Sequence, residues 1–271
     1  MATSAGSVQL SPLMTELLSR YDEQIRQHTA GLFEKYAKLA EDFAATARAR
    51  HQTFIDQIAR SLEARTAPLA TEARATVLSL AQRGWYLDPK LTMRQTMYVL
   101  EVYNRGAHRK AEQLLSRYYE KHLSTIEREI CSTSPSRAKI LRAAFWAHRR
   151  KKYGLSIPVL LMQADGMCLD VLNTQLFQRR SGRPATAEAL GTLSAPTLAF
   201  LAPLMEPVPI TASRQERITL PPDEINRHAI IHGESVTYGT RVNSYKAISL
   251  LRYLAWMLPT PQGARRNPSV P

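Results

Sequence analysis

Apolar residues recur every three or four positions along most of this chain, which is the spacing of amphipathic α-helices. The longest such stripe runs from Met14 to Leu62 without a proline. From Leu32 onward it follows an eleven-residue repeat, which favours straight or slightly right-handed helix pairing. We therefore expect residues 1–82 to form an amphipathic, coiled-coil-like helical arm. The alternative is a helix that packs on its own domain.

The same periodicity predicts a series of shorter helices beyond Pro68, over residues 69–83, 92–104 and 106–131, and after Pro135. The next segment is apolar on all sides between Val159 and Met162, which predicts a core helix. We expect Ser156 or Ile157 to cap this helix, with Pro158 in its first turn. Polar groups inside it need partners, and a core arginine would suit Asp165.

The last third of the chain is less regular. Residues 178–209 are rich in Arg, Gly, Ala, Leu and Pro and predict a loop-rich surface insert with at most a short helix. Asn243-Ser244 would cap a final helix over residues 245–258. No segment predicts a convincing strand, so the expected fold class is all-α. The predicted parts are the arm, a helical bundle over residues 83–258, and a disordered basic tail over 259–271.

The distribution of charge also separates the predicted arm from the rest of the chain. The net charge is +13, and residues 1–82 hold nine basic and nine acidic side chains, so the excess lies entirely in residues 83–271. A segregated positive charge points to an anionic partner, although it also serves solubility. The candidate nucleic-acid-binding residues are those of the two densest basic runs: Arg149, Arg150, Lys151, Lys152, Arg179, Arg180 and Arg183.

Other totals narrow the class of protein. The amino terminus lacks a charged region followed by an apolar run, and the longest apolar run, about Leu198 to Ile210, carries three prolines and Glu206 and is too short to span a bilayer. We therefore expect a soluble, cytoplasmic protein with no membrane partner. Cys131 and Cys168 lie in apolar-patterned segments, which predicts buried free thiols.

The densest run of chemically capable residues is Ile225–Glu234. His228 and His232 have the spacing of a two-histidine metal site, but Ala229 stands where a zinc protease needs its glutamate. No Gly-rich phosphate loop or Cys pair is present. The sequence therefore predicts neither a metal nor a cofactor.

Arg227 and His232 together suit chemistry on a phosphodiester. Arginine offers a fixed fork of donors to phosphate oxygens, and histidine can move the proton of a ribose 2′-hydroxyl near neutral pH. In one helix the two side chains would point about 140° apart, since a turn holds about 3.6 residues. They would meet more easily if the helix ended at Gly233 or if two chains shared the site.

Arg227-His228-Ala229-Ile230-Ile231-His232 resembles the HEPN signature, in which an Arg and a polar residue precede a short apolar spacer and a His. The motif stands before the last helix of the expected bundle, where that superfamily carries it. The wider pattern is similar to a bacterial group of HEPN-like proteins. It comprises Gly84-Trp85, Ser156-Ile157-Pro158 with Gln163 to Gly166, Asn226 with Gly233, and Tyr238-Gly239-Thr240 with Asn243-Ser244.

The resemblance covers about residues 83–258 and implies a dimeric bundle of four or five helices that acts as a metal-independent RNA endonuclease. Such proteins work in phage defence, toxin–antitoxin and stress systems, so an antitoxin or another defence protein would be a partner. The resemblance assigns Arg227 to phosphate orientation, His232 to acid–base chemistry and His228 to the polar position. The candidate supporting residues are Asn226, Glu234, Tyr238 and Asp165.

Two alternatives stay open at the level of sequence. The first is a catalytically silent HEPN-like module that holds nucleic acid or protein through its basic residues. The second is an assembly protein that works through its amino-terminal arm.

Overall fold

The computed structural model describes residues 11–14, 16–17, 20–21, 70–180, 182–190, 195–219 and 224–258. These residues are helical apart from turns, loops and one two-stranded antiparallel sheet, so the predicted all-α class is confirmed. Most of the predicted arm lies outside the described residues, and so does the predicted tail over 259–271.

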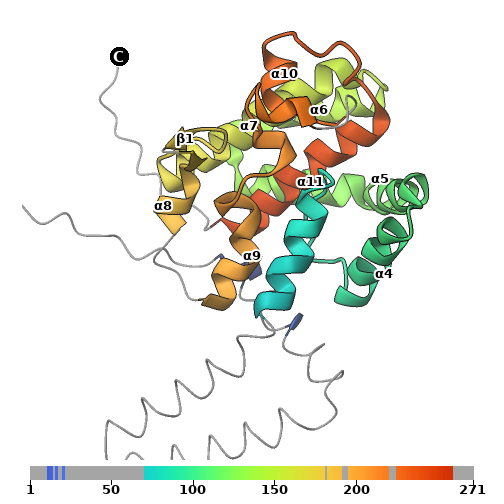
Figure 1. The fold of residues 1–271 in the computed structure, drawn as a ribbon. Coiled ribbons are helices and arrows are strands. Elements are labelled where there is room, and N and C mark those ends of the chain that lie inside the picture. Colours follow the sequence, from blue (N-terminus) through green and yellow to red (C-terminus); the bar gives the residue numbers. More distant parts are fainter. Residues whose placement is uncertain are drawn as a thin grey trace, which may run out of the picture.

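Helix α11 (Arg241–Met257) is the centre of the fold. Every residue from its third position onward is buried, as expected for a helix in the interior. It packs against α7 (Tyr153–Leu172) and α5 (His108–Thr133), as Figure 1 shows. In turn, α6 (Ala138–Arg149) packs against α7, and α4 (Met93–Asn104) packs against α5. The candidate motif therefore leads directly into the central helix.

Helix ends follow the sequence signals at α4 and α6, whereas the starts of α7 and α11 differ from the prediction. Thr92 caps α4 through a reciprocal box with Gln95, and Pro135 opens a 3-10 turn that leads into α6. The prediction that Asn243-Ser244 caps the last helix is wrong. Thr240 is the cap, because its Oγ1 accepts from the Asn243 N–H at 3.1 Å. The Asn243 side chain donates instead to the Tyr238 carbonyl at 3.1 Å.

Helix α7 begins earlier than predicted. It starts at Tyr153, so Pro158 lies inside the helix and neither Ser156 nor Ile157 is a cap. A proline inside a helix leaves the carbonyl four residues earlier without its N–H donor. That carbonyl belongs to Gly154, and it accepts from the Tyr238 hydroxyl at 2.9 Å. A long-range contact thus replaces the missing helical bond.

The predicted loop-rich insert is more ordered than expected. It contains β1 (Arg179–Arg180), β2 (Arg183–Pro184), α8 (Thr186–Leu190) and α9 (Ala195–Met205). The prediction of at most a short helix is wrong for α9, whose apolar residues are largely buried on several sides. Such a segment lacks the alternation of polar and apolar faces that reveals a surface helix. Three-residue η2 (Pro209–Thr211) then leads toward the candidate site.

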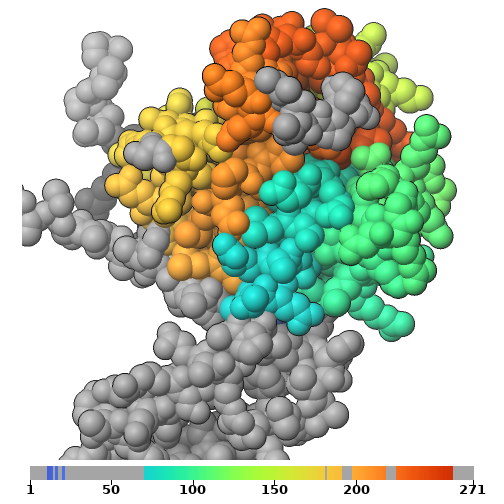
Figure 2. Space-filling view, viewed as in Figure 1, coloured from blue at the N-terminus to red at the C-terminus, as the bar shows by residue number. Residues whose placement is uncertain are grey.

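The core extends amino-terminal of residue 83. Met14, Leu17 and the inner face of the helical residues 70–81 belong to the same hydrophobic cluster as the bundle. Trp256 of α11 donates its indole N–H to the Leu13 carbonyl at 2.8 Å. In Figures 1 and 2 the helix over 70–81 lies between α9 and α4. These early residues are therefore part of the bundle's packing.

Helix α7 is a core helix with one exposed face. It is the one helix of the described residues that is long and apolar enough to cross a membrane, and a core helix of a soluble protein passes the same test. It is packed between α6 and α11, yet Leu155, Met162 and Leu169 are 66%, 50% and 43% exposed. Cys131 and Cys168 are buried free thiols, as predicted.

A buried ion-pair cluster fixes α11 to the segments around it. The Arg252 guanidinium and the Asp88 carboxylate are each 1% exposed, and Arg252 Nε lies 3.3 Å from Asp88 Oδ2. Arg252 Nη1 also lies 2.5 Å from Glu129 Oε2, and Lys90 Nζ donates to the other oxygen of Glu129 at 2.7 Å. Because a buried charge without a partner is costly, these groups depend on one another.

His148 is a buried histidine that titrates far from its usual range. Its Nδ1 is hydrogen-bonded to Ser244 Oγ at 2.7 Å, and its ring packs edge-on against Tyr245. Burial, with the charges of Arg149 and Arg241, lowers the pKa of His148 to about 4. The folded protein therefore holds this side chain neutral at physiological pH.

We expect His148 to make the protein less stable in acid. The unfolded chain binds a proton near pH 6.5 and the folded chain near pH 4, so its contribution is complete above pH 6.5 and is lost as the pH falls toward 4. Between pH 7 and pH 5 the loss is about 2 kcal/mol, at about 1.4 kcal/mol per pH unit below 6.5. Urea unfolding of wild type and His148→Gln measures this loss as a difference in slope with pH. Equal slopes of stability with pH in wild type and His148→Gln would contradict the expectation. The matched control is His108→Gln, a change at an exposed histidine.

Candidate functional site

The candidate motif forms a short helix, α10 (Arg227–Ile231), held by Asn226. The Asn226 side chain accepts from the Ala229 N–H at 3.0 Å and donates to the carbonyls of Pro209 and Ala212 at 2.8 and 2.9 Å. It is 3% exposed. Asn226 therefore fixes the position of α10 from within, and the structure places its amide in these contacts and not on the open surface.

His228 and His232 lie against each other at the end of α10. Their ring centroids are 4.4 Å apart, and Gly233 with φ of 71° ends the helix as predicted. His232 is exposed, and the His228 side chain is 39% exposed. Partial burial, followed by the effect of His232, lowers the pKa of His228. His228 is thus neutral at pH 7 and able to accept a proton.

Glu234 lies between two arginines and His228 and contacts all three. Its carboxylate is paired with Arg217, and Arg214 Nε lies 3.9 Å from it. The other carboxylate oxygen is 3.5 Å from His228 Nδ1. The hydrogen bond from Arg217 lowers the pKa of Glu234, which is therefore ionised near neutral pH. Arg214 and Arg217 were not predicted, because they lie in a separate charged run whose link to the motif arises only in the fold.

Arg227 is half-buried and turned toward α7. Its Nη2 lies 4.0 Å from Asp165 Oδ2, and its guanidinium lies over the Phe177 ring at 5.4 Å from the centroid. The predicted arginine partner of Asp165 is therefore Arg227. Asp165 also accepts from the Phe177 N–H at 3.2 Å. These contacts orient Arg227 and leave its side chain 31% exposed.

Tyr238 and Gly239 close the loop that follows the motif. The Tyr238 hydroxyl is bonded to Gly154, as described above, and a Cβ on Gly239 would come within 3.4 Å of the Gly154 nitrogen. The loop between α10 and α11 is therefore held against the start of α7. Tyr238 positions this loop, whereas the candidate chemistry lies at the other end of it.

The predicted basic run at the end of α6 contains two arginines with side-chain contacts and two exposed lysines. Arg149 is paired with Glu127, and Arg150 lies over the Trp146 ring at 5.8 Å from the centroid. Lys151 and Lys152 are exposed, and Lys151 has a φ of 58° in the turn that ends α6. The run thus forms a basic turn beside an exposed tryptophan, a combination suited to single-stranded nucleic acid.

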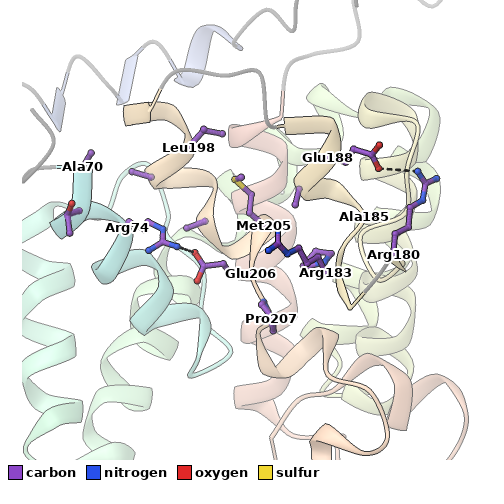
Figure 3. Close-up of a pocket in the computed structure, with 15 residues that line it drawn as sticks. Ala70, Arg74, Arg180, Arg183, Ala185, Glu188, Leu198, Met205, Glu206 and Pro207 are labelled. Atoms are coloured by element: carbon purple, nitrogen blue, oxygen red, sulfur yellow. Dashed lines mark hydrogen bonds and ion pairs between the residues drawn. The ribbon is translucent and has the colours of Figure 1, made fainter. Parts of the chain in front are cut away.

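The predicted arginines of the hairpin divide between two places. Arg179 is paired with Glu216 of η3 (Glu216–Thr219), next to Arg217, the partner of Glu234, and it lowers the pKa of Glu216 to about 2. Arg180 and Arg183 instead line a groove of about 1040 Å³ between α9, the hairpin and the start of the helix over 70–81, where Arg180 faces Glu188 (Figure 3). The groove is separate from the residues around His228 and His232.

The cluster can bind an anion and transfer a proton. We call the charged and titratable residues within or beside α10 the histidine cluster. It consists of Arg214, Arg217, Arg227, His228, His232 and Glu234. Among the described residues, no three His, Cys, Asp or Glu side chains are placed to hold a metal ion.

The chain was compared with protein-family models, with curated proteins and with solved structures, and nothing matches in any of the three comparisons.

Proposed function

We propose that this protein is a HEPN-type, metal-independent RNA endonuclease of phage-defence, toxin–antitoxin or stress systems. The observation that carries the proposal is the His228–His232 pair, with ring centroids 4.4 Å apart, close to arginines that Glu234 and Asp165 hold in place. Arginine forks suit phosphate oxygens, and a neutral imidazole suits removal of a ribose proton.

In the proposed reaction Arg227 orients the phosphate and His232 acts as general acid or base. The 2′-hydroxyl loses its proton to the base and attacks phosphorus, the bond to the 5′-oxygen breaks, and that oxygen takes up a proton. The products are a 2′,3′-cyclic phosphate and a 5′-hydroxyl, so no external oxidant, reductant or water is consumed in this step. His228, kept neutral, serves as a second proton acceptor beside His232.

A homodimer would bring Arg227 of one copy to His232 of the other. Support for pairing comes from α7, whose exposed Leu155, Met162 and Leu169 are seven residues apart and share one face. Paired helices carry two apolar positions in every seven residues, and these three exposed residues occupy one of the two. We propose that this face meets its counterpart in a second copy.

Purified protein is incubated with RNA in EDTA to test the proposal. We expect fragments to accumulate while the protein is folded and dimeric, because the proposed chemistry uses side chains alone. Intact RNA under these conditions would count against nuclease activity.

The second candidate is a catalytically silent module that binds nucleic acid. It is favoured by the contacts of Arg227 with Asp165 and Phe177, which hold its guanidinium within its own chain. This candidate predicts salt-sensitive RNA binding without product. Neutralising Lys151 and Lys152 would then weaken binding and reduce its dependence on salt.

A further inference from the structure

A second basic site lies where α5 packs against the first turn of α11. A cavity of about 380 Å³ opens there, within the usual size range of small-ligand pockets. None of its residues belongs to the histidine cluster, and its lining consists of Arg109, Glu112, Gln113, Ser116, Arg117, Arg241 and Val242.

The α5 residues of this cavity lie on one face of the helix, since the others follow Arg109 by three, four, seven and eight residues. Three arginines and one glutamate line the cavity, so its lining carries a net charge of +2. Glu112 is 3.3 Å from the Nζ of Lys246, a buried lysine that is shared with Glu224 at 3.0 Å. Arg241 is paired with Glu120, so the positive field inside the cavity comes mainly from Arg109 and Arg117, which have no ion pair among the described residues.

The amino terminus of α11 adds to this field. Arg241 and Val242 are the first two residues of a 17-residue helix, where backbone N–H groups lack helical partners and the helix dipole is positive. Arg241 Nη2 is held by Glu120 Oε2 at 2.7 Å. That contact and the Tyr245 ring, whose centroid is 5.6 Å from the guanidinium carbon, fix the side chain.

Ser116 provides an independent sign of a ligand. It is one of the residues that line the cavity, it is 6% exposed, and its buried hydroxyl has no hydrogen-bond partner within the described part of the chain. A buried hydroxyl without a partner destabilises a protein, and such groups are rare unless something else completes them. A serine hydroxyl can reach a new partner by rotation about χ1.

We propose that this cavity binds a terminal phosphate, a dianionic phosphomonoester borne by a free nucleotide or by the end of a nucleic-acid strand. Arg109 and Arg117 have no ion-pair partner among the described residues, and their two charges match a phosphomonoester near neutral pH, whereas each internal phosphodiester carries a single negative charge. Arginine forks and helix-terminal N–H groups both suit phosphate oxygens. The site does not require the proposed cleavage reaction.

Calorimetric titration tests this site with 5′-AMP and adenosine, at fixed salt. We expect 5′-AMP to bind and adenosine not to bind. Arg109→Gln with Arg117→Gln weakens 5′-AMP binding about 100-fold, at about tenfold per charged hydrogen-bonding group. Arg128→Gln, an exposed change on the same helix outside the cavity, is the matched control and leaves the affinity within about twofold.

A second pair of ligands separates the two sources of the phosphate. A short 2′-O-methyl RNA, which cannot be cleaved through its 2′-oxygen, is compared with and without a 5′-phosphate. Tighter binding of the phosphorylated strand than of the same strand without its phosphate identifies a strand end, and equal binding of the two strands identifies the phosphate of the free nucleotide. Equal binding of adenosine and 5′-AMP, or equal affinity of the double variant and Arg128→Gln, would overturn the proposal. So would failure of wild type to bind 5′-AMP at millimolar concentration.

Ser116→Ala distinguishes a ligand contact from a packing role. We expect the variant to keep or increase its unfolding temperature, because a buried hydroxyl without a partner is removed. Its affinity for 5′-AMP falls about fivefold, the effect of one hydrogen bond. Unchanged affinity would remove Ser116 from the site.

Discussion

His232→Ala is expected to lower the rate of RNA cleavage in EDTA by about 10²–10⁴-fold, the usual effect of losing a positioned acid or base. Arg227→Ala is expected to lower it by about 10²-fold, because one phosphate-orienting fork is lost. Arg227→Lys keeps the charge without the fork and recovers part of this loss. Single-turnover rates on one labelled RNA measure all three effects.

The matched control for His232 is His108, an exposed histidine at the start of α5. His108→Ala should cleave at the wild-type rate. Cleavage that persists in His232→Ala, or that is lost equally in His108→Ala, would remove His232 from the proposed chemistry. Because His232 is exposed, circular dichroism should show the same fold in wild type and variant.

Asp88→Ala is expected to lower the free energy of unfolding by about 3 kcal/mol. The change leaves the Arg252 guanidinium, 1% exposed, with Glu129 as its remaining carboxylate partner in the cluster. It also removes the acceptor of the Lys90 N–H, which is 2.8 Å from Asp88 Oδ1. Urea unfolding at pH 7 measures the loss.

Glu101→Ala is the matched control for Asp88→Ala. Glu101 is paired with Arg105 on the surface of α4, with 53% and 74% of the two side chains exposed. An exposed pair of this kind contributes about 0.5 kcal/mol or less. Similar losses in the two variants would contradict the importance of burial for the Arg252 cluster.

The sequence predicted those helices whose polar and apolar faces differ. α4 and α5 begin and end within a few residues of the predicted positions. One face of each helix is buried and the other is exposed to solvent, so their apolar residues show the helical spacing. α9 was missed, since burial on several sides removes that contrast. Pro158 lies inside α7 and not at its start, because the Tyr238 hydroxyl that replaces its missing hydrogen bond comes from a distant part of the chain, which no local pattern predicts.

The candidate site was predictable only where its residues are adjacent in sequence. The motif gave Arg227, His228 and His232, and Gly233 marked the end of its helix. Arg214 and Arg217 depend on the path of the chain before α10, and no local spacing connects them to Glu234. The cavity beside Ser116 was missed for the same reason, since α5 and α11 are brought together only by packing.

The most direct test of the central claim is the chemistry of the fragment ends in EDTA. RNA cleaved by wild type is analysed by mass spectrometry, with His232→Ala in parallel. The proposed reaction predicts 2′,3′-cyclic phosphate ends, or the monoesters formed when they hydrolyse, together with 5′-hydroxyl ends from wild type and intact RNA from the variant. Fragments that end in a 3′-hydroxyl, or the same fragments from His232→Ala, would contradict the claim that Arg227 and His232 form a ribonuclease site.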